Sequence, residues 1–522
     1  MTSRGIQSEI ADATRPHSIR WWPAFLILAL AAVVLIWIWV WYGVSRQDRN
    51  IATVQVIFFT LILLLLWVVF FSRFRPRIRR TILAGVFGLI ISAAGLFRIR
   101  GVTGDLLPIL EFRWKPKPPS TVPVTAPGTP GAQISPSAFD YPQFLGPFRN
   151  ATVSGPKLER DWTSSPPASV WRQPIGPAWS GFAILGHHAV TQEQHGEDEM
   201  VVCYDLLTGK VIWSHADKAH YHTTIAGEGP RATPTLAGNR VYSLGATGIL
   251  NCLDLAAGRR IWSKDIIQEN QSRVPDWGLS GSPLVVDHLV VVSAGGHDNR
   301  SLVACDKENG QFVWGGGSDG TGYSSPYLAM LGGTRQILIF NSSGVAAHAV
   351  DSGRILWEYP WPGGHPHVAL PVVLPDNQVL VSSGYGTGSE LLRILAERNW
   401  LPRRVWKSTR LKAKFTNVVY RDGFIYGLDD GILVCLDASD GSLKWKEGRY
   451  GHGQVILNGD LLLLLSESGE VVLLEPVPAE HRKLAAFPAL EGKTWNPPAL
   501  AGEFLLVRND KEAACYRMPV VR

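Results

Sequence analysis

The sequence predicts an all-β fold, an eight-bladed β-propeller closed by strands from both ends of the domain, preceded by three transmembrane α-helices. Two observations lead to this fold class. A Cys-Asp-Gly-Trp spacing recurs within residues 137–522, and three apolar stretches without a charged residue lie within residues 21–97. A propeller blade is a four-stranded repeat of about 40 residues, and a membrane-spanning helix needs about 20 apolar residues.

The repeated motif is typical of the last hairpin of a blade. Three copies keep all four residues, a fourth has Cys305 displaced by one position, and a fifth keeps only the Gly and the Trp. The Asp can bond its own backbone and the Gly can adopt a positive φ, so the two close a tight turn between strands. The Gly and Trp positions predicted to join blades are Gly209, Trp213, Gly258, Trp262, Gly310, Trp314, Gly353, Trp357, Gly441 and Trp445.

The number of blades follows from the outer-strand positions. Seven complete four-stranded units fit between Trp171 and Phe487, and three further apolar segments follow Phe487. The strand that this last unit lacks is present at residues 169–175, so we expect an eighth blade built from both ends, which leaves no open sheet edge. The alternative is a seven-bladed ring with flanking extensions.

The first hundred residues predict a membrane anchor. Residues 21–42, 51–71 and 81–97 are each long enough to cross a bilayer, and a cleaved signal peptide is the alternative for the first. The segment between the second and third stretches carries five arginines, which the positive-inside rule places in the cytoplasm. We therefore expect a cytoplasmic tail at residues 1–20, a multi-pass protein of the inner membrane, and a propeller on the periplasmic or extracytoplasmic side.

Two segments connect the anchor to the propeller. Residues 98–114 are assigned only as juxtamembrane. Residues 115–136 are dominated by Pro, Ser, Thr, Gly and Lys, which favours an extended, semi-rigid linker.

The charge distribution argues against a nucleic-acid partner. The chain has a formal charge of +6, but residues 1–136 hold 15 basic and 5 acidic residues, which leaves an acidic excess in the remainder. A propeller without a basic stripe lacks the electrostatic pattern of a DNA or RNA binder. All five Cys lie in different hairpins, too far apart for disulfides, and are expected to be buried free thiols.

These repeats resemble those of the PQQ-like, quinoprotein-type family of tryptophan-docking propellers, which includes BamB-like members. The resemblance covers residues 139–517 and implies that the Trp of one blade packs on the Gly turn of its neighbour. Quinoprotein dehydrogenases of this family carry a vicinal Cys pair, calcium held by Glu and Asn, and an Asp base. Here no two Cys are adjacent, and a haem-attachment Cys-x-x-Cys-His is absent. We therefore expect no cofactor and no catalytic residues, with PQQ and calcium as the alternative.

Three other sequence patterns are candidate sites. Blade one is rich in His and acidic residues between His187 and His222, which a metal could use, although a solvated polar loop explains them better. The segment Gly384-Tyr-Gly-Thr-Gly is interpreted as a turn and not as a phosphate loop. Binding is expected at the mouth of the ring, in the segments that lead into the inner strands, at Trp179, Arg231, Trp277, Tyr323, His367, Lys414, His452 and Trp495.

Three functions remain open at this stage. The first is a non-catalytic protein-interaction scaffold of the cell envelope that contacts envelope proteins, in outer-membrane protein assembly by analogy with the BamB-like members. The absence of a Cys before Cys203 departs from lipoprotein relatives and puts that analogy in doubt. The second is a membrane-bound PQQ-dependent oxidoreductase. The third is an envelope ligand sensor.

Overall fold

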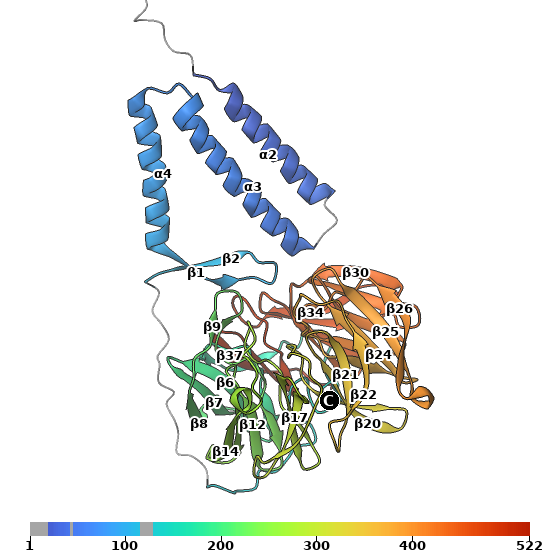
Figure 1. Cartoon of the computed structure of the whole chain (residues 1–522). Coiled ribbons are helices and arrows are strands. Elements are labelled where there is room, and N and C mark those ends of the chain that lie inside the picture. The colour runs from blue at the N-terminus through green and yellow to red at the C-terminus, as the bar shows by residue number, and fades with distance from the viewer. Residues whose placement is uncertain (1–18, 42–44, 115–128, 522) are drawn as a thin grey trace, which may run out of the picture. The chain divides into compact units, whose positions relative to one another are not determined.

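The computed structural model describes residues 19–41, 45–114 and 129–521. The chain divides into two compact units, Met1–Pro116 and Lys117–Arg522, which are described separately below. The first unit contains three long helices and a hairpin, and the second is a β-propeller (Figure 1). The predicted cytoplasmic tail, except for its last two residues, and residues 115–128 of the predicted linker lie outside the described residues.

Within its described residues, the first unit contains three helices long and apolar enough to cross a membrane. They are α2 (Trp22–Val40), α3 (Arg46–Leu66), which continues into the π-helical turn η1 (Trp67–Phe71), and α4 (Pro76–Leu96). The second and third begin five residues earlier than the apolar stretches predict. Ser45 caps α3 by accepting a hydrogen bond from the Asp48 amide, and Pro76 starts α4, so local start signals set these ends and not hydropathy.

A two-stranded hairpin follows α4 directly. Its strands are β1 (Phe97–Val102) and β2 (Pro108–Phe112), paired antiparallel. Residues 98–114, which the sequence left without an assignment, therefore form a compact element.

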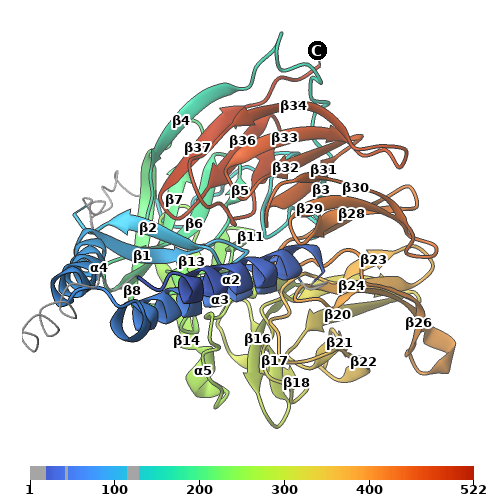
Figure 2. The ribbon, with the colours of Figure 1, turned by 90° about the horizontal axis from the view of Figure 1, so that it is seen from above.

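The propeller has eight four-stranded antiparallel blades that follow one another around a ring (Figure 2). Blade one contains β5 (Ala183–Leu185), β6 (His188–His195), β7 (Asp198–Asp205) and β8 (Val211–Lys218). Blade two contains β11 (Thr235–Ala237), β12 (Arg240–Leu244), β13 (Ile249–Asp254) and β14 (Arg260–Asp265). Blade three contains β15 (Leu284–Val286), β16 (Leu289–Gly296), β17 (Arg300–Asp306) and β18 (Phe312–Gly316).

The next four blades repeat this order. Blade four contains β19 (Tyr327–Leu331), β20 (Thr334–Phe340), β21 (Gly344–Ala349) and β22 (Ile355–Pro360). Blade five contains β23 (Val372–Leu374), β24 (Gln378–Ser383), β25 (Gly388–Leu395) and β26 (Leu401–Ser408). Blade six contains β27 (Val418–Arg421), β28 (Phe424–Asp429), β29 (Ile432–Asp437) and β30 (Leu443–Arg449). Blade seven contains β31 (Gln454–Asn458), β32 (Leu461–Leu465), β33 (Glu470–Glu475) and β34 (Arg482–Pro488).

Blade eight confirms the predicted closure from both ends of the domain. Its strands β35 (Ala499–Ala501), β36 (Phe504–Arg508) and β37 (Glu512–Arg517) come from the C-terminal end, and its outer strand β4 (Ala168–Pro174) comes from the N-terminal end. In Figure 2, β4 lies beside β37, and the two pair antiparallel. Short elements between blades are β9 (His222–Thr223), β10 (Gly227–Glu228) and α5 (Ile266–Glu269), and η2 (Ala396–Arg398) lies within blade five between β25 and β26.

The repeated Asp and Gly form the turn between the third and outer strands. In blade one the Gly209 amide donates to the Asp205 carbonyl at 2.8 Å, and the Asp205 side chain accepts from the Thr208 amide at 2.8 Å. Gly209 has a φ of +69°, a conformation that L side chains rarely adopt.

Five of the outer-strand Trp residues pack on the Gly turn of the next blade, as the resemblance implies. Trp445, also predicted to dock, donates instead to the Val477 carbonyl of blade seven at 2.9 Å, in a turn without a Gly. The Trp213 Nε1 donates to the Leu255 carbonyl at 2.8 Å, and its ring lies against Gly258. The same arrangement joins Trp171 to Gly209, Trp262 to Gly310, Trp314 to Gly353 and Trp406 to Gly441.

The junction between blades four and five is built differently. Blade five replaces the Asp-Gly turn with η2 and the left-handed residues Asn399 and Trp400. Trp357, the outer-strand Trp of blade four, donates instead to Gln336 of its own blade at 2.9 Å. Trp400 reaches back to Gly332 of blade four. Both indoles pack in the apolar cluster shared by blades four and five, Trp357 from the outer strand of blade four and Trp400 from blade five.

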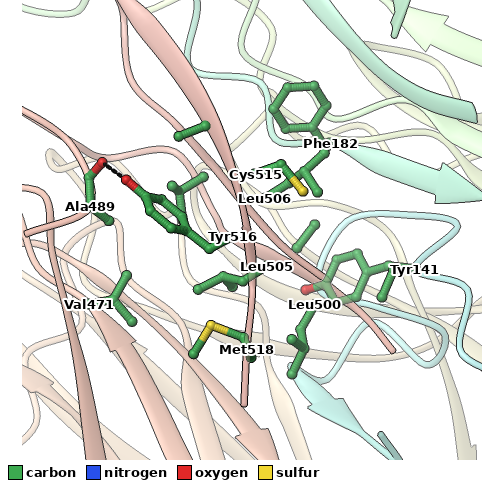
Figure 3. Close-up of a cluster of buried hydrophobic side chains, with 14 of the residues drawn as sticks. Tyr141, Phe182, Val471, Ala489, Leu500, Leu505, Leu506, Cys515, Tyr516 and Met518 are labelled. Carbon is green, nitrogen blue, oxygen red and sulfur yellow. Dashed lines mark hydrogen bonds between the residues drawn. The ribbon is translucent and has the colours of Figure 1, made fainter. Parts of the chain in front are cut away.

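The five cysteines are buried free thiols, as predicted. Cys203 pairs across the hairpin with Trp213, and Cys515 pairs with Trp171, so the small thiol makes room opposite the docking indole. Figure 3 shows Cys515 among Leu506, Phe182 and other apolar side chains.

Candidate functional site: the plugged channel and its aromatic rim

The two faces of the ring differ in which connections they carry. On one face, here called the rim face, each blade's inner strand begins and its second strand turns into its third. On the other, here called the turn face, lie the inner hairpin turns and the Asp-Gly turns. Residues 129–140 lie on the turn face, because the Gly131 amide donates to Asp254 and the Gly186 amide donates to Asp140. The last residues of the predicted linker therefore contact the propeller.

The chain then enters the centre of the ring. Residues 141–158, here called the plug, pair with inner strands on several sides. Tyr141 forms a bridge with Ile184 of blade one, and the strand β3 (Thr152–Val153) pairs in parallel with β31, on the axis side of blade seven. Leu158 then bridges to Val520. The plug therefore rises from the turn face and returns to it.

Arg149 fixes the plug at the rim end of the channel. Its guanidinium donates to the carbonyls of Ser282 at 3.0 Å and Pro326 at 2.9 Å, and also to the carbonyl of Pro283 and the hydroxyl of Thr235. These groups belong to blades two, three and four, so one side chain ties three inner strands together. Burial lowers the pKa of Arg149 to about 9.

The plug bears on whether a quinone cofactor fits the axis of the ring. Arg149 is only 2% exposed, and the small cavity beside it is lined by plug residues and by blades four to six. Within the described residues no group of three or more His, Cys, Asp or Glu side chains is placed to hold a metal ion. The plug and the Arg149 side chain therefore occupy the rim end of the ring's axis.

Aromatic and cationic side chains gather on the rim face where blades six, seven, eight and one meet. The Trp179 and Trp495 rings lie 4.9 Å apart, and Phe415 lies 4.7 Å from Trp495. The Lys493 ammonium lies 4.0 Å from the centre of the Trp495 ring and 4.6 Å from that of Trp179. We call Trp179, Phe415, His452, Lys493 and Trp495 the rim cluster. It combines half-buried apolar surface with a cation held on indole faces.

Glu467, on the turn between β32 and β33, organises the rim cluster. Its Oε1 accepts from Trp495 Nε1 at 2.9 Å and its Oε2 accepts from the His452 amide at 3.0 Å. The His452 ring packs 4.9 Å from Phe415. The position of Trp495 is therefore set by a hydrogen bond and not only by packing.

A second group lies on the rim face at blades two to four. The Trp277 and Tyr323 rings are 5.3 Å apart, and Arg231 Nε donates to the Trp277 carbonyl at 2.8 Å. The Arg231 guanidinium stacks 4.5 Å from the Tyr221 ring. Burial lowers the pKa of Arg231 to about 10. Three of the eight predicted binding residues, Arg231, Trp277 and Tyr323, therefore belong to this second group and not to the rim cluster.

Four of the predicted binding residues are buried: Arg231, His367, Lys414 and His452. His367 stacks 4.3 Å from Phe340 and contacts the carbonyl of Asn341, so it belongs to the interior. Lys414 lies under the Tyr385 ring, at 4.8 Å. These side chains support the rim, whereas Trp179, Trp277, Tyr323 and Trp495 keep exposed surface.

One carboxyl near the rim has a strongly shifted pKa. Glu199, at the start of the third strand of blade one, is 5% exposed, and its Oε1 accepts from the Ala246 amide at 3.1 Å. Burial raises the pKa of Glu199 to about 7. A neutral amide at this position, as in Glu199→Gln, should remove the free-energy cost of burying a charged carboxylate.

The His-rich part of blade one does not assemble into one site. His195 contacts Glu193 at 2.7 Å, His215 contacts Asp217 at 3.4 Å, and His220 contacts Glu228 at 3.4 Å. Several of these residues lie in β6 to β8, not in a single polar loop as the sequence suggested.

Sequence reasoning missed several rim residues. Two of them lie beside predicted binding residues: Lys493 precedes Trp495 by two residues, and Phe415 follows Lys414. Tyr385 lies in the Gly-rich segment that the sequence indicated only as a turn. Phe148 was missed because nothing in its local sequence shows that residues 141–158 enter the channel. It lies at the tip of the plug, next to Arg149, and is 71% exposed. Only the folded ring brings these residues to one face.

Comparisons with known proteins agree with this architecture. The family model described as outer membrane protein assembly factor BamB matches residues 197–447. The outer membrane protein assembly factor BamB of Yersinia pestis is 21% identical over 336 residues, which are 61% of this chain and 70% of that protein. The structure of BamB from Moraxella catarrhalis aligns with a TM-score of 0.50 at 15% identity, over 67% of this chain and 98% of that chain. Saccharomyces cerevisiae Sqt1 aligns with a TM-score of 0.50 at 11% identity, over 67% of this chain and 99% of that chain.

The fold and the docking junctions define the chain as a tryptophan-docking propeller. Its repeats match the PQQ-like family model over residues 197–447, and the chain is similar to the BamB-like propellers. The three apolar helices lie outside the residues that the family model matches.

Proposed function

We propose that this chain is a membrane-anchored, non-catalytic interaction scaffold of the cell envelope, acting in outer-membrane protein assembly. In this proposal the helices lie in the inner membrane, the N-terminus is cytoplasmic, and the propeller is on the periplasmic side. Its partners are envelope proteins that bind the rim face.

One observation carries the proposal. The centre of the ring is filled by the chain's own plug, while the rim face carries half-exposed Trp179, Trp277, Tyr323 and Trp495. Aromatic side chains with an apolar body and a polar edge are the residues that protein interfaces favour. The similarity to assembly factors supports the same function, an interaction scaffold in outer-membrane protein assembly.

The proposed orientation rests on the arginines that lie where the second helix ends and the third begins. Arg73 and Arg75 lie between the helices, and Arg77, Arg79 and Arg80 lie in the first turns of α4. Basic residues near helix ends favour the cytoplasmic side.

The proposal is tested by crosslinking in native membranes. Phe148, exposed at the tip of the plug on the rim face, is replaced by photoreactive benzoylphenylalanine in the full-length chain. The matched control is the same replacement at Phe139, which is 44% exposed and lies over Gly502 on the turn face. We expect Phe148 to capture envelope proteins of outer-membrane assembly that Phe139 does not capture.

Equal capture at both positions, or no repeated partner at Phe148, would contradict the scaffold. The oxidoreductase alternative is tested separately by titrating the full-length chain with PQQ and calcium. We expect neither tight binding nor dye-linked oxidation of alcohols or sugars.

A further inference from the structure

The hairpin after α4 has an apolar face that is exposed. The strand β2 alternates, with Pro108, Leu110 and Phe112 exposed and Ile109 and Glu111 more covered. Leu110 is 60% exposed and Phe112 is 56% exposed. The cross-strand partner of Leu110 is Ile99, itself 58% exposed, and the Phe112 ring lies 4.6 Å from the ring of Phe97. With Trp114, which is 71% exposed, these residues form what we call the hairpin face.

The opposite side of the hairpin carries a charged pair beside Ile109. Arg98 and Glu111, paired across the two strands, form an ion pair at 2.9 Å. An apolar face backed by charged residues is the arrangement of an element that lies at a boundary between water and an apolar phase.

The hairpin is fixed at the ends of two helices. Asp105, in its turn, accepts from Asn50 Nδ2 through its carbonyl at 2.9 Å and pairs with Arg46 at 3.4 Å, both near the start of α3. Arg113, just after β2, donates to the Ala94 carbonyl at the end of α4 at 2.8 Å. The start of α3 and the end of α4 therefore lie on one side of the unit, and the hairpin lies across them (Figure 1).

We propose that the hairpin face is seated in the interfacial layer of the same bilayer that α4 crosses, on the side where α4 ends. The inference rests on the membrane anchoring proposed above. The occupant is lipid, because α4 passes into β1 with no residue between Leu96 and Phe97, and no residue of α4 is buried. The apolar surface of the helix is thus continuous with the hairpin face. Phe97, Phe112 and Trp114 supply the aromatic side chains that favour this layer, and Arg98 and Arg113 supply basic groups for the headgroups.

The test uses site-directed spin labels in the full-length chain, reconstituted into phosphatidylethanolamine and phosphatidylglycerol vesicles. Labels are placed at Leu110→Cys on the hairpin face and, as the matched control, at Glu111→Cys on the next residue of the same strand. A third label at Ile90→Cys reports whether α4 is inserted. The native thiols are buried, and burial raises the pKa of Cys252 to about 12, so they should remain unlabelled.

Collision rates with oxygen, which concentrates in lipid, and with a water-soluble nickel chelate separate the outcomes. We expect the ratio of oxygen to nickel collisions at Leu110 to be several-fold higher than at Glu111 and lower than at Ile90, which lies within the spanning helix. A high nickel rate at Leu110 would place the face in water and overturn the proposal. Low rates for both reagents would mean that protein covers the face, which also overturns it. A high nickel rate at Ile90 would instead contradict the membrane anchoring itself. Ile99→Cys repeats the measurement from the facing strand.

Discussion

Two sets of tryptophans in the same ring have opposite environments. The docking indoles donate to a backbone carbonyl of the next blade, and most of them, such as Trp213 at 1% exposed, are buried. The rim indoles, such as Trp179 and Trp495, are half-buried and stack on each other and on Lys493. The set that repeats with the blades stabilises the ring, whereas the set that does not repeat forms a surface. Tryptophans that repeat from blade to blade therefore indicate the architecture of the ring, and tryptophans outside the repeat mark the candidate site.

The largest effect should come from the docking set. Trp213→Ala should lower the free energy of unfolding by about 3 to 5 kcal/mol, because a large buried ring is lost and a cavity remains. Chemical denaturation of the full-length chain in detergent measures this loss. Trp179→Ala, the matched rim change, should cost far less, and an equal cost would remove the distinction between the two sets.

The plug should come next. Arg149→Met should lower the free energy of unfolding by about 3 kcal/mol, because several buried acceptors lose their donor. Arg149→Lys should recover part of the loss. Limited proteolysis at residues 141–158 gives a second readout, and unchanged protection would show that Arg149 does not hold the plug.

A change near the rim should stabilise the fold. Burial raises the pKa of Glu199 to about 7, above its usual value near 4.3, so the folded state holds this proton more tightly than the unfolded chain does. The favourable contribution is complete below about pH 4 and is lost as the pH rises through about 7. At pH 8, Glu199→Gln should therefore raise the free energy of unfolding by about 2 kcal/mol, with little gain at pH 4. Denaturation at both pH values checks this, and a gain that does not depend on pH would contradict it.

The smallest effect isolates the contact between blades. Gly441 and Gly423 both lie in blade six with positive φ, at +72° and +87°. A methyl group at Gly441 would lie 2.7 Å from the Trp406 ring, whereas one at Gly423 meets nothing within 4 Å. Gly441→Ala should therefore cost about 1 kcal/mol more than Gly423→Ala, the excess being overpacking against the indole. Thermal unfolding of both variants measures it, and equal costs would mean that only backbone strain matters.

The sequence predicted the parts of the fold that repeat. The Asp-Gly-Trp spacing fixed the hairpins, and the strand at residues 169–175 fixed the closing blade, because local turn chemistry and strand count are visible in one dimension. The plug was not predictable, since Arg149 satisfies carbonyls from three blades that are far apart in the chain. The different junction at blades four and five was also missed, because the contact of Trp400 with Gly332 joins residues that are far apart in the chain. At the site, the predicted segments lead into inner strands, but the exposure of their side chains is not visible in one dimension. His367 is buried, whereas Trp495 keeps exposed surface.

The central claim is that the rim cluster binds partners without being needed for folding. The most direct measurement compares the wild-type chain with Trp179→Ala/Trp495→Ala, quantifying both the unfolding midpoint and the yield of proteins that copurify from native membranes at equal amounts of folded chain. We predict a nearly unchanged midpoint and a loss of at least about tenfold in partner yield, equivalent to about 1.4 kcal/mol of binding. Full partner yield with an unchanged midpoint would contradict the claim.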